Sequence, residues 1–213
     1  MKSSSKNQIE NIYRERSTGE IPWNRETLPD VLKNLVDSGR VSSCRAVDWG
    51  CGAGHYAIAL AGLGFRMTGI HFSETAIKIA QENALEKGVA CRFITADVLG
   101  DLKEVDETFD FAYDWELLHH IFPEDREMYV HNVSRLIEPG GRYLSVSFSE
   151  ESPQFGGKGK VRETPLGTVL YFSSESELKA LFEPLFRILE LTTVDIPGKH
   201  GMHRAVKAFM TKA

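Results

Sequence analysis

Residues 47–54, Val47-Asp48-Trp49-Gly50-Cys51-Gly52-Ala53-Gly54, decide the fold class of this chain. Residues 46–48 are typical of a short buried strand, the alternating glycines form the turn after it, and a helix is expected from His55 to Leu63. Glycine has no Cβ atom, so the backbone of this turn can approach a ligand closely, and the next helix presents free N–H groups. In a doubly wound sheet this turn lies at the edge where ligands bind.

The same strand and helix unit repeats along the chain. The expected strands are residues 66–70, 92–95, 109–113 and 142–148, and the expected helices are residues 73–86 and 124–137. A turn at 139–141 precedes the last of these strands. This alternation predicts an α/β fold, with a doubly wound parallel sheet and helices on both faces.

Weaker patterns stand at both ends of the chain. Residues 1–8 are polar and expected to fray, while Ile9, Ile12 and Tyr13 predict a short helix and residues 28–36 a second one. Residues 149–170 carry four glycines and little periodicity, which predicts a long loop that is either a lid or merely mobile. Ser174 and Glu177 then form a capping box that opens a helix. Two strands are expected at 186–194 and 204–210, joined by residues 196–203.

Composition narrows the functional classes. The 213 residues include 25 Lys and Arg against 30 Asp and Glu, a net charge of -5, which argues against non-specific binding to nucleic acid or anionic lipid. Apolar runs stay well short of the roughly 20 residues that a membrane helix needs, and the first residues are too polar for a signal peptide, so a cytoplasmic location is expected. The three cysteines form no C-x-x-C pair, so neither a disulfide framework nor a cysteine zinc site is expected.

Two classes of cofactor compete for the glycine turn. Residues 52–57 fit the dinucleotide pattern G-x-G-x-x-A, but His71 stands about 20 residues on, where a ribose-binding carboxylate is expected. Asp48 instead places a negative charge at the strand end, which favours a ligand with a positive group. S-adenosylmethionine carries an ammonium and a sulfonium and has no pyrophosphate.

Four motifs in order resemble those of class I S-adenosylmethionine-dependent methyltransferases. They are residues 47–54, residues 94–98 (Ile-Thr-Ala-Asp-Val), residues 109–114 with 117–121 (Phe-Asp-Phe-Ala-Tyr-Asp and Leu-Leu-His-His-Ile) and residues 136–141 (Leu-Ile-Glu-Pro-Gly-Gly). Residues 13–24 are similar to the segment that closes over cofactor and acceptor in small-molecule methyltransferases of the thiopurine and tellurite-resistance type. The resemblance implies a mostly parallel, seven-stranded, Rossmann-like sheet whose last strand is antiparallel, and methyl transfer from S-adenosylmethionine.

The resemblance also implies a division of the chain and a set of binding residues. One domain over residues 1–213 would comprise an N-terminal helical cap (1–40), a cofactor-binding core (41–148) and an acceptor-side loop with C-terminal strands (149–213). The residues expected to bind the cofactor are Trp23, Asp48, Gly50, Cys51, Gly52, Gly54, His71, Phe72, Asp97, Val98 and Asp114. Asp97 would hold the adenine amino group. His71 stands where the family usually has Asp or Glu on the ribose hydroxyls, and neutral imidazole cannot replace a bidentate carboxylate.

Catalysis of this reaction requires little covalent chemistry from the protein. The transfer is an in-line displacement, so the enzyme mainly aligns donor and acceptor and excludes water, and a general base is needed only if the acceptor must lose a proton. Possible bases cluster just past the fourth strand: Asp114, Glu116, His119 and His120. His119 and Asp114 are the predicted catalytic residues. Their spacing matches no standard zinc pattern, so no metal is expected, and a nucleophilic role for Cys51 is not expected either.

The function predicted from these features is methyl transfer to a small-molecule acceptor at S, N, O or a metalloid, without a nucleic-acid or membrane partner. A protein that binds S-adenosylmethionine or S-adenosylhomocysteine without turnover, as a regulator or accessory protein, is the alternative that His71 favours. A nicotinamide oxidoreductase is a third possibility. Basic residues in the two late loops could meet an anionic acceptor or could be solvated: Lys158, Lys160, Arg162, Lys199, His200, His203 and Arg204.

Overall fold

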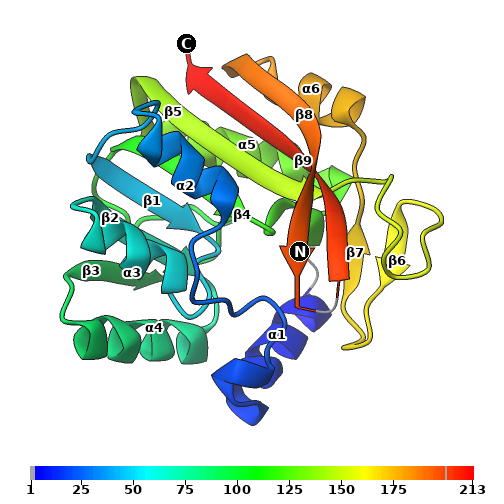
Figure 1. Cartoon of the computed structure of the whole chain (residues 1–213), viewed down its shortest axis with the longest axis horizontal. Helices are drawn as coiled ribbons and strands as arrows, with labels where there is room; N and C mark the ends of the chain where they lie inside the picture. Colours follow the sequence, from blue (N-terminus) through cyan, green and yellow to red (C-terminus); the bar gives the residue numbers. More distant parts are fainter. Residues whose placement is uncertain (1–2, 200) are drawn as a thin grey trace.

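The computed structural model describes residues 3–199 and 201–213 (Figure 1). Within these ranges the main sheet has seven strands in the order β3-β2-β1-β4-β5-β9-β8. They are β1 (Arg45–Trp49), β2 (Arg66–His71), β3 (Cys91–Thr95), β4 (Phe109–Trp115), β5 (Ile137–Phe148), β8 (Phe186–Gly198) and β9 (Gly201–Lys212). Pairs from β3 to β5 are parallel, and β9 is antiparallel to both of its neighbours. The predicted doubly wound sheet with one antiparallel strand is confirmed.

Helices cover both faces of this sheet. They are α1 (Ser3–Glu15), α2 (Asp30–Asp37), α3 (His55–Gly62), α4 (Glu74–Lys87), α5 (Pro123–Leu136) and α6 (Glu175–Phe182), with the 3-10 turns η1 (Thr18–Glu20) and η2 (Leu118–His120). Their ends follow local signals in the sequence. Ser73 accepts a hydrogen bond from the amide of Ala76 at the start of α4, and the predicted capping box of Ser174 and Glu177 opens α6.

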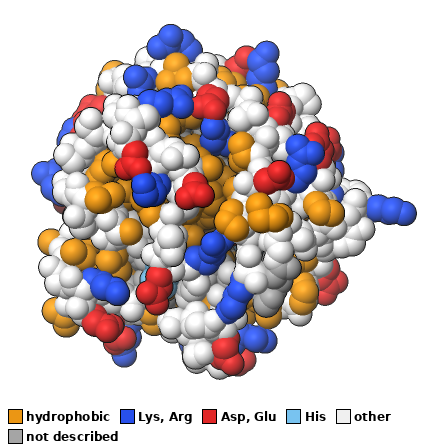
Figure 2. All heavy atoms as spheres, viewed as in Figure 1, with side chains coloured by type: hydrophobic (Ala, Val, Ile, Leu, Met, Phe, Trp, Pro, Cys, Tyr) orange, Lys and Arg blue, Asp and Glu red, His pale blue; other side chains and the backbone are white. Residues whose placement is uncertain are grey.

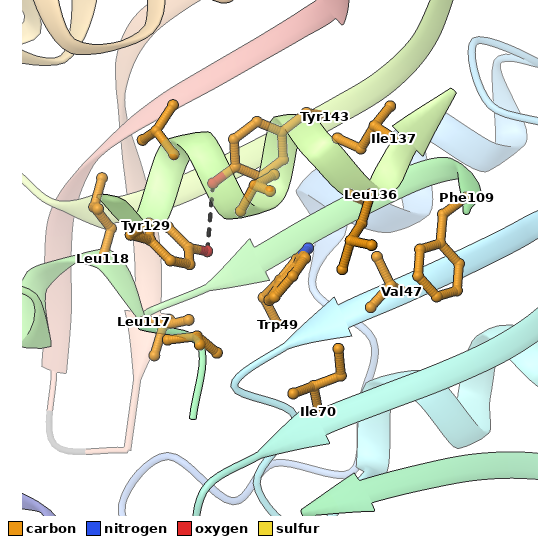
Figure 3. Packing of buried hydrophobic residues seen from close by; sticks show 14 of the residues in the cluster. Val47, Trp49, Ile70, Phe109, Leu117, Leu118, Tyr129, Leu136, Ile137 and Tyr143 are labelled. Carbon is orange, nitrogen blue, oxygen red and sulfur yellow. Dashed lines mark hydrogen bonds between the residues drawn. The ribbon is translucent and has the colours of Figure 1, made fainter. Parts of the chain in front are cut away.

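The sheet separates two hydrophobic cores. Val47 and Trp49 of β1 pack with α5 and α6 on one face, whereas Ala46 packs with α2, α3 and α4 on the other. Successive side chains of a strand point to opposite faces, which explains why a single strand serves both cores. Figure 3 shows the α5 face, where Trp49 lies edge-on to Tyr129 with the ring centroids 6.2 Å apart.

Contacts at the N-terminus correct one prediction. Residues 5–8 were expected to fray, but they are helical in α1. Ile9, Ile12 and Tyr13 form a third cluster with Ile21, Ala53 and Ala76, and Gln8 donates a hydrogen bond to the carbonyl of Leu166 at 2.8 Å. Tertiary packing therefore stabilises a helix that its polar first turns alone did not indicate.

Three further segments carry more strand than the sequence indicated. The predicted loop 149–170 contains β6 (Val161–Glu163), which pairs with β7 (Val169–Tyr171). The predicted turn 139–141 lies inside β5, and the predicted connection 196–203 is mostly strand, because β8 and β9 continue to Gly198 and from Gly201. In the β6–β7 pair and the outer β8–β9 hairpin, pairing with a neighbouring strand supplies the backbone hydrogen bonds and overrides weak local propensity, whereas residues 139–141 lie at a register shift of the β4–β5 pair.

Candidate active site

A cavity of about 820 Å³ lies at the carboxyl ends of β1, β2 and β4. Its walls come from five parts of the chain: the glycine turn, the N-terminal segment, the residues after β4, the region from β5 to β7, and the tip of the β8–β9 hairpin. Figure 1 shows that α1 and this hairpin approach the same edge of the sheet. On this side of the molecule, hydrophobic side chains gather in the middle of the face and charged ones surround them (Figure 2). The cavity therefore joins segments that are distant in the sequence.

The glycine turn forms one wall. Gly50 and Gly52 have φ values of 76° and 53°, which L side chains rarely adopt. A Cβ atom at Gly52 would lie 2.5 Å from the Tyr13 hydroxyl, and one at Gly50 would lie 2.9 Å from Leu117. Both glycines line the cavity, as does Cys51 between them. The turn presents backbone to the cavity because no side chain fits there.

Gly54, the third glycine of the turn, serves packing instead. A Cβ atom there would lie 2.8 Å from the ring of Phe93 and 2.9 Å from Ala80, so this glycine lets α3 approach β3 and α4. It does not line the cavity. The cofactor contact expected of Gly54 therefore stays a prediction, while the structure shows its role in packing.

Asp48 supplies a carboxyl group under the glycine turn. Its side chain is buried on the cavity wall, and this burial raises the pKa of Asp48 to about 7. A buried carboxylate is costly unless a positive charge accompanies it. The site is thus suited to a cationic ligand group such as an ammonium.

His71 and Phe72 continue the wall at the end of β2. The amide of Ser73 donates to His71 Nδ1 at 3.0 Å, and the imidazole is stacked on Phe72 with the centroids 4.7 Å apart. Burial lowers the pKa of His71 to about 4, so the ring is neutral at pH 7. Because Nδ1 accepts a hydrogen bond, this assignment places the proton on Nε2. His71 therefore offers a donor where the family pattern has acceptors.

The N-terminal segment covers the part of the cavity next to Gly52. Trp23 donates its indole N–H to the Tyr13 hydroxyl at 2.8 Å, and both rings line the cavity. The segment is tied to the β8–β9 hairpin by two bonds to carbonyls, from Lys199 to Gly19 and from Arg25 to Pro197. In the sequence, Tyr13 belonged both to a predicted helix and to the segment 13–24 expected to close over the ligands. Its contact with Gly52 depends on folding.

Asp97 lies in a separate cavity of about 400 Å³ that shares Phe72 with the first. Lys6 of α1 forms an ion pair with its carboxylate, and the other carboxylate oxygen accepts a hydrogen bond from the amide of Leu99 at 3.1 Å. Val98, by contrast, is buried in the α5 core and lines neither of these two cavities. The cofactor contact expected of Val98 has no support from the lining of these two cavities and stays a prediction.

The carboxylate of Asp114 lies on the face of the sheet that α5 covers, away from the cavity. Its carboxylate accepts hydrogen bonds from Tyr143 at 2.5 Å, Tyr129 at 3.2 Å and Ser145 at 3.2 Å, all on the α5 face of the sheet. Figure 3 shows the two tyrosines in that core. Asp114 is fully buried there and does not line the cavity. Strand alternation turns it away from the cavity, so its position lends no support to the predicted catalytic and cofactor-binding roles, which stay predictions.

His119, the other predicted catalytic residue, does line the cavity, next to Phe148. Its ring is stacked on Phe148 with the centroids 4.1 Å apart, and its Nδ1 accepts the amide of Phe148 at 3.4 Å. His203, from β9, is stacked on the same Phe148 ring at 4.5 Å. Burial lowers the pKa of His119 well below its usual value. The pair of imidazoles thus forms an aromatic wall with Phe148.

The other basic residues of the late loops have structural partners. Arg162 is buried, lies over the Phe172 ring and donates to the carbonyls of residues 150, 152, 154 and 159. Lys160 pairs with Glu150 and Glu177, and Arg204 with Glu151. Lys158 is exposed on the loop, and residue 200 lies outside the described ranges. An anionic acceptor therefore has few of these charges to meet.

Metal and thiol chemistry have little support in this cavity. Within residues 3–199 and 201–213, no group of three or more His, Cys, Asp or Glu side chains is placed to hold a metal ion. Burial raises the pKa of Cys51 well above its usual value, so its thiol stays protonated and is a poor nucleophile.

None of the helices in the described part of the chain is long and apolar enough to span a bilayer.

Comparisons with known proteins identify the family. A methyltransferase domain model matches residues 46–141. The chain is 29% identical over 178 residues to the 2-heptyl-1-hydroxyquinolin-4(1H)-one methyltransferase of Mycobacteroides abscessus, covering 80% of this chain and 77% of that protein. It is 30% identical over 193 residues to the ubiquinone biosynthesis O-methyltransferase of Pseudomonas fluorescens, covering 83% and 80%.

A solved structure agrees with the fold. The structure that concerns conversion of a disulfide bond into a thioacetal group during echinomycin biosynthesis superimposes with a TM-score of 0.82 at 24% identity, covering 97% of this chain and 92% of that one. The alternative of a binding protein without turnover is set aside, because the matched relatives are enzymes. The chain belongs to the class I S-adenosylmethionine-dependent methyltransferases and methylates a small-molecule acceptor.

Proposed function

We propose that the protein methylates an oxygen or sulfur atom on a small molecule that carries an aromatic or similarly planar ring. The observation that carries this proposal is the aromatic end of the cavity, where His119, Phe148 and His203 form a stacked wall. Phe155 and Leu170 add apolar surface next to it. Such walls favour flat apolar rings, which gain dispersion contacts and lose little hydration when they are buried.

The cofactor end of the same cavity fits S-adenosylmethionine. Gly50 and Gly52 leave room for a ligand against the backbone, and the carboxyl group of Asp48 suits an ammonium. When bound, S-adenosylmethionine supplies a methyl group on a positively charged sulfur. In this proposal Trp23 and Tyr13 exclude water above it, and His71 donates to the ribose. Asp97 accepts from the adenine amino group after Lys6 is displaced.

This assignment supports the division of the chain inferred from sequence. Residues 1–40 act as a cap, residues 41–148 hold most of the cofactor contacts, and residues 149–213 contribute acceptor contacts through Phe155, Leu170 and His203. The two relatives reported above support the acceptor class, since one methylates a hydroxyquinolinone and the other is an O-methyltransferase. We therefore expect transfer to a ring hydroxyl, N-hydroxyl or aromatic thiol.

The test is a direct assay of methyl transfer. The purified protein is incubated with methyl-labelled S-adenosylmethionine and one of three acceptors: 2-heptyl-1-hydroxyquinolin-4(1H)-one, catechol or thiophenol. Mass spectrometry identifies the product, and calorimetry measures cofactor binding in parallel. A methylated ring product supports the proposal. Cofactor binding without transfer to any of the three acceptors contradicts it.

A further inference from the structure

Glu116 has an unusual backbone conformation on the wall of the cavity. It follows β4 directly, and its φ of 61° lies in the left-handed region that non-glycine residues seldom occupy. Its amide donates to the carbonyl of Val146 at 2.8 Å, so β5 holds this conformation in place. Backbone strain of this kind persists only where the surrounding structure enforces it, and it gathers at functional sites. The consequence is that Glu116 lines the cavity while its neighbour Asp114 does not.

The carboxyl group of Glu116 has no bonding partner in the part of the chain that the structure describes. The hydrogen bonds and ion pairs among those residues include none to its side chain. The groups that act on it electrostatically are Arg25, from the N-terminal segment, and Tyr56, from α3. Arg25 already donates to the carbonyl of Pro197. Burial raises the pKa of Glu116 to about 7.

Three other titratable groups that line the cavity, Asp48, His119 and His120, are less suited than Glu116 to accept a proton from the acceptor. Asp48 lies under the glycine turn, at the cofactor end. His119 uses Nδ1 to accept the amide of Phe148, which leaves Nε2 protonated and able only to donate. Burial lowers the pKa of His120 to about 4, so its imidazole is a weak base. An unpaired carboxyl group whose pKa lies near neutrality is better matched to proton abstraction at physiological pH.

We propose that Glu116 is the general base of the reaction, and that the acceptor presents its nucleophilic atom as a protonated hydroxyl, N-hydroxyl or thiol. The inference rests on the proposed function. In the step, the acceptor heteroatom loses its proton to a carboxylate oxygen of Glu116 and forms a bond to the methyl carbon. The electron pair of the sulfur–methyl bond stays on sulfur, which becomes a neutral thioether. The Glu116 carboxyl group then returns its proton to water.

This assignment also excludes a class of acceptors. An anion that carries no proton, such as thiocyanate, gains nothing from a base and is repelled by a carboxylate at the acceptor end. The neutral imidazoles of His119 and His120 offer such an anion no charge in compensation. Glu116 therefore selects for acceptors that arrive protonated.

The first experiment compares wild type with Glu116→Gln, Glu116→Asp and the control Glu82→Gln, which changes an exposed carboxylate on α4. The acceptors are 2-heptyl-1-hydroxyquinolin-4(1H)-one, thiophenol and thiocyanate. We expect Glu116→Gln to lower kcat for the two protic acceptors by about 100-fold or more, with cofactor affinity unchanged. This deficit should shrink as the pH rises above the pKa of the acceptor, and Glu116→Asp should retain part of the rate.

Three results would overturn the assignment: an unchanged kcat in Glu116→Gln, a loss that is the same at every pH, and a wild-type preference for thiocyanate. The second of these would indicate that Glu116 only positions the acceptor. The proposed function itself fails separately, if cofactor binds and no acceptor is methylated.

A binding measurement decides the role of Glu116 even without turnover. 4-Nitrophenol is added to the complex with S-adenosylhomocysteine, and the absorbance of the bound dye reports how much of it is phenolate. We expect a smaller phenolate fraction in wild type and in Glu82→Gln than in Glu116→Gln at the same pH, because an ionised carboxylate beside a phenol raises the pKa of that phenol. Equal fractions in the three proteins would show that Glu116 does not face the bound ligand.

Discussion

The ligand-free Glu116→Gln variant should be more stable than wild type at alkaline pH. Burial raises the pKa of Glu116 from 4.5 to about 7, so the folded protein holds this proton more tightly than the unfolded chain does. Stability from this group is present below the unfolded pKa and is lost as the pH rises through the folded pKa. The Gln amide does not titrate and also keeps the backbone in the left-handed region. The comparison therefore isolates the ionisation of one carboxyl group.

The expected difference follows from these two pKa values. Compared with a side chain that does not titrate, ionisation of Glu116 lowers the free energy of unfolding of wild type. The loss is about 0.2 kcal/mol at about pH 4, about 0.8 kcal/mol at about pH 5 and about 3 kcal/mol at about pH 8. Asp48, His71 and His120 have shifted pKa values in both proteins, so their own contributions cancel in the difference.

Urea unfolding, followed by tryptophan fluorescence across this pH range, measures that difference. Glu82→Gln serves as the control, because it makes the same chemical change at an exposed side chain of α4, away from the cavity. The reasoning is refuted if the difference in unfolding free energy between wild type and Glu116→Gln is the same at every pH. It is refuted equally if wild type becomes the more stable protein as the pH rises.

Four other changes test the rest of the site. Asp48→Asn should weaken S-adenosylmethionine binding by about 1 to 3 kcal/mol, because it removes the buried negative charge, and calorimetry showing full affinity would remove Asp48 from the site. Lys6→Met should tighten cofactor binding by at most about 1 kcal/mol, since it frees Asp97 from a partly exposed ion pair, and weaker binding would mean that Asp97 does not meet the adenine. His71→Asp should also tighten binding in calorimetry by offering two acceptors to the ribose hydroxyls, and equal or lower affinity would count against a ribose contact. Arg162→Met should lower the free energy of unfolding in urea by about 2 kcal/mol or more and speed amide exchange in residues 150–163, because four carbonyls lose a charged donor. An unaltered exchange rate in that segment would mean that Arg162 does not hold it in place.

Much of the fold could be predicted because its signals are local. The glycine turn after β1, the Ser73 cap of α4 and the capping box of Ser174 each act over a few residues. The strand and helix alternation then allows few topologies, so the order of the parallel strands follows from general rules. Segments whose structure depends on distant partners were missed. The first turns of α1, where Lys6 pairs with Asp97 and Gln8 bonds the carbonyl of Leu166, are one example, and the outer part of the β8–β9 hairpin is another.

The sequence by itself determined the family, the sheet and the approximate place of the site, since these depend on short motifs and their order. Tertiary structure alone decided which residues of that neighbourhood face the cavity. Asp114 and Glu116 are two positions apart, and a regular strand would have pointed them the same way. The left-handed backbone at Glu116 breaks that alternation, and only the packed sheet enforces it. Tyr13 and His203 were only two of many residues in the segments expected near the site, and contacts across the chain decide that their rings line the cavity.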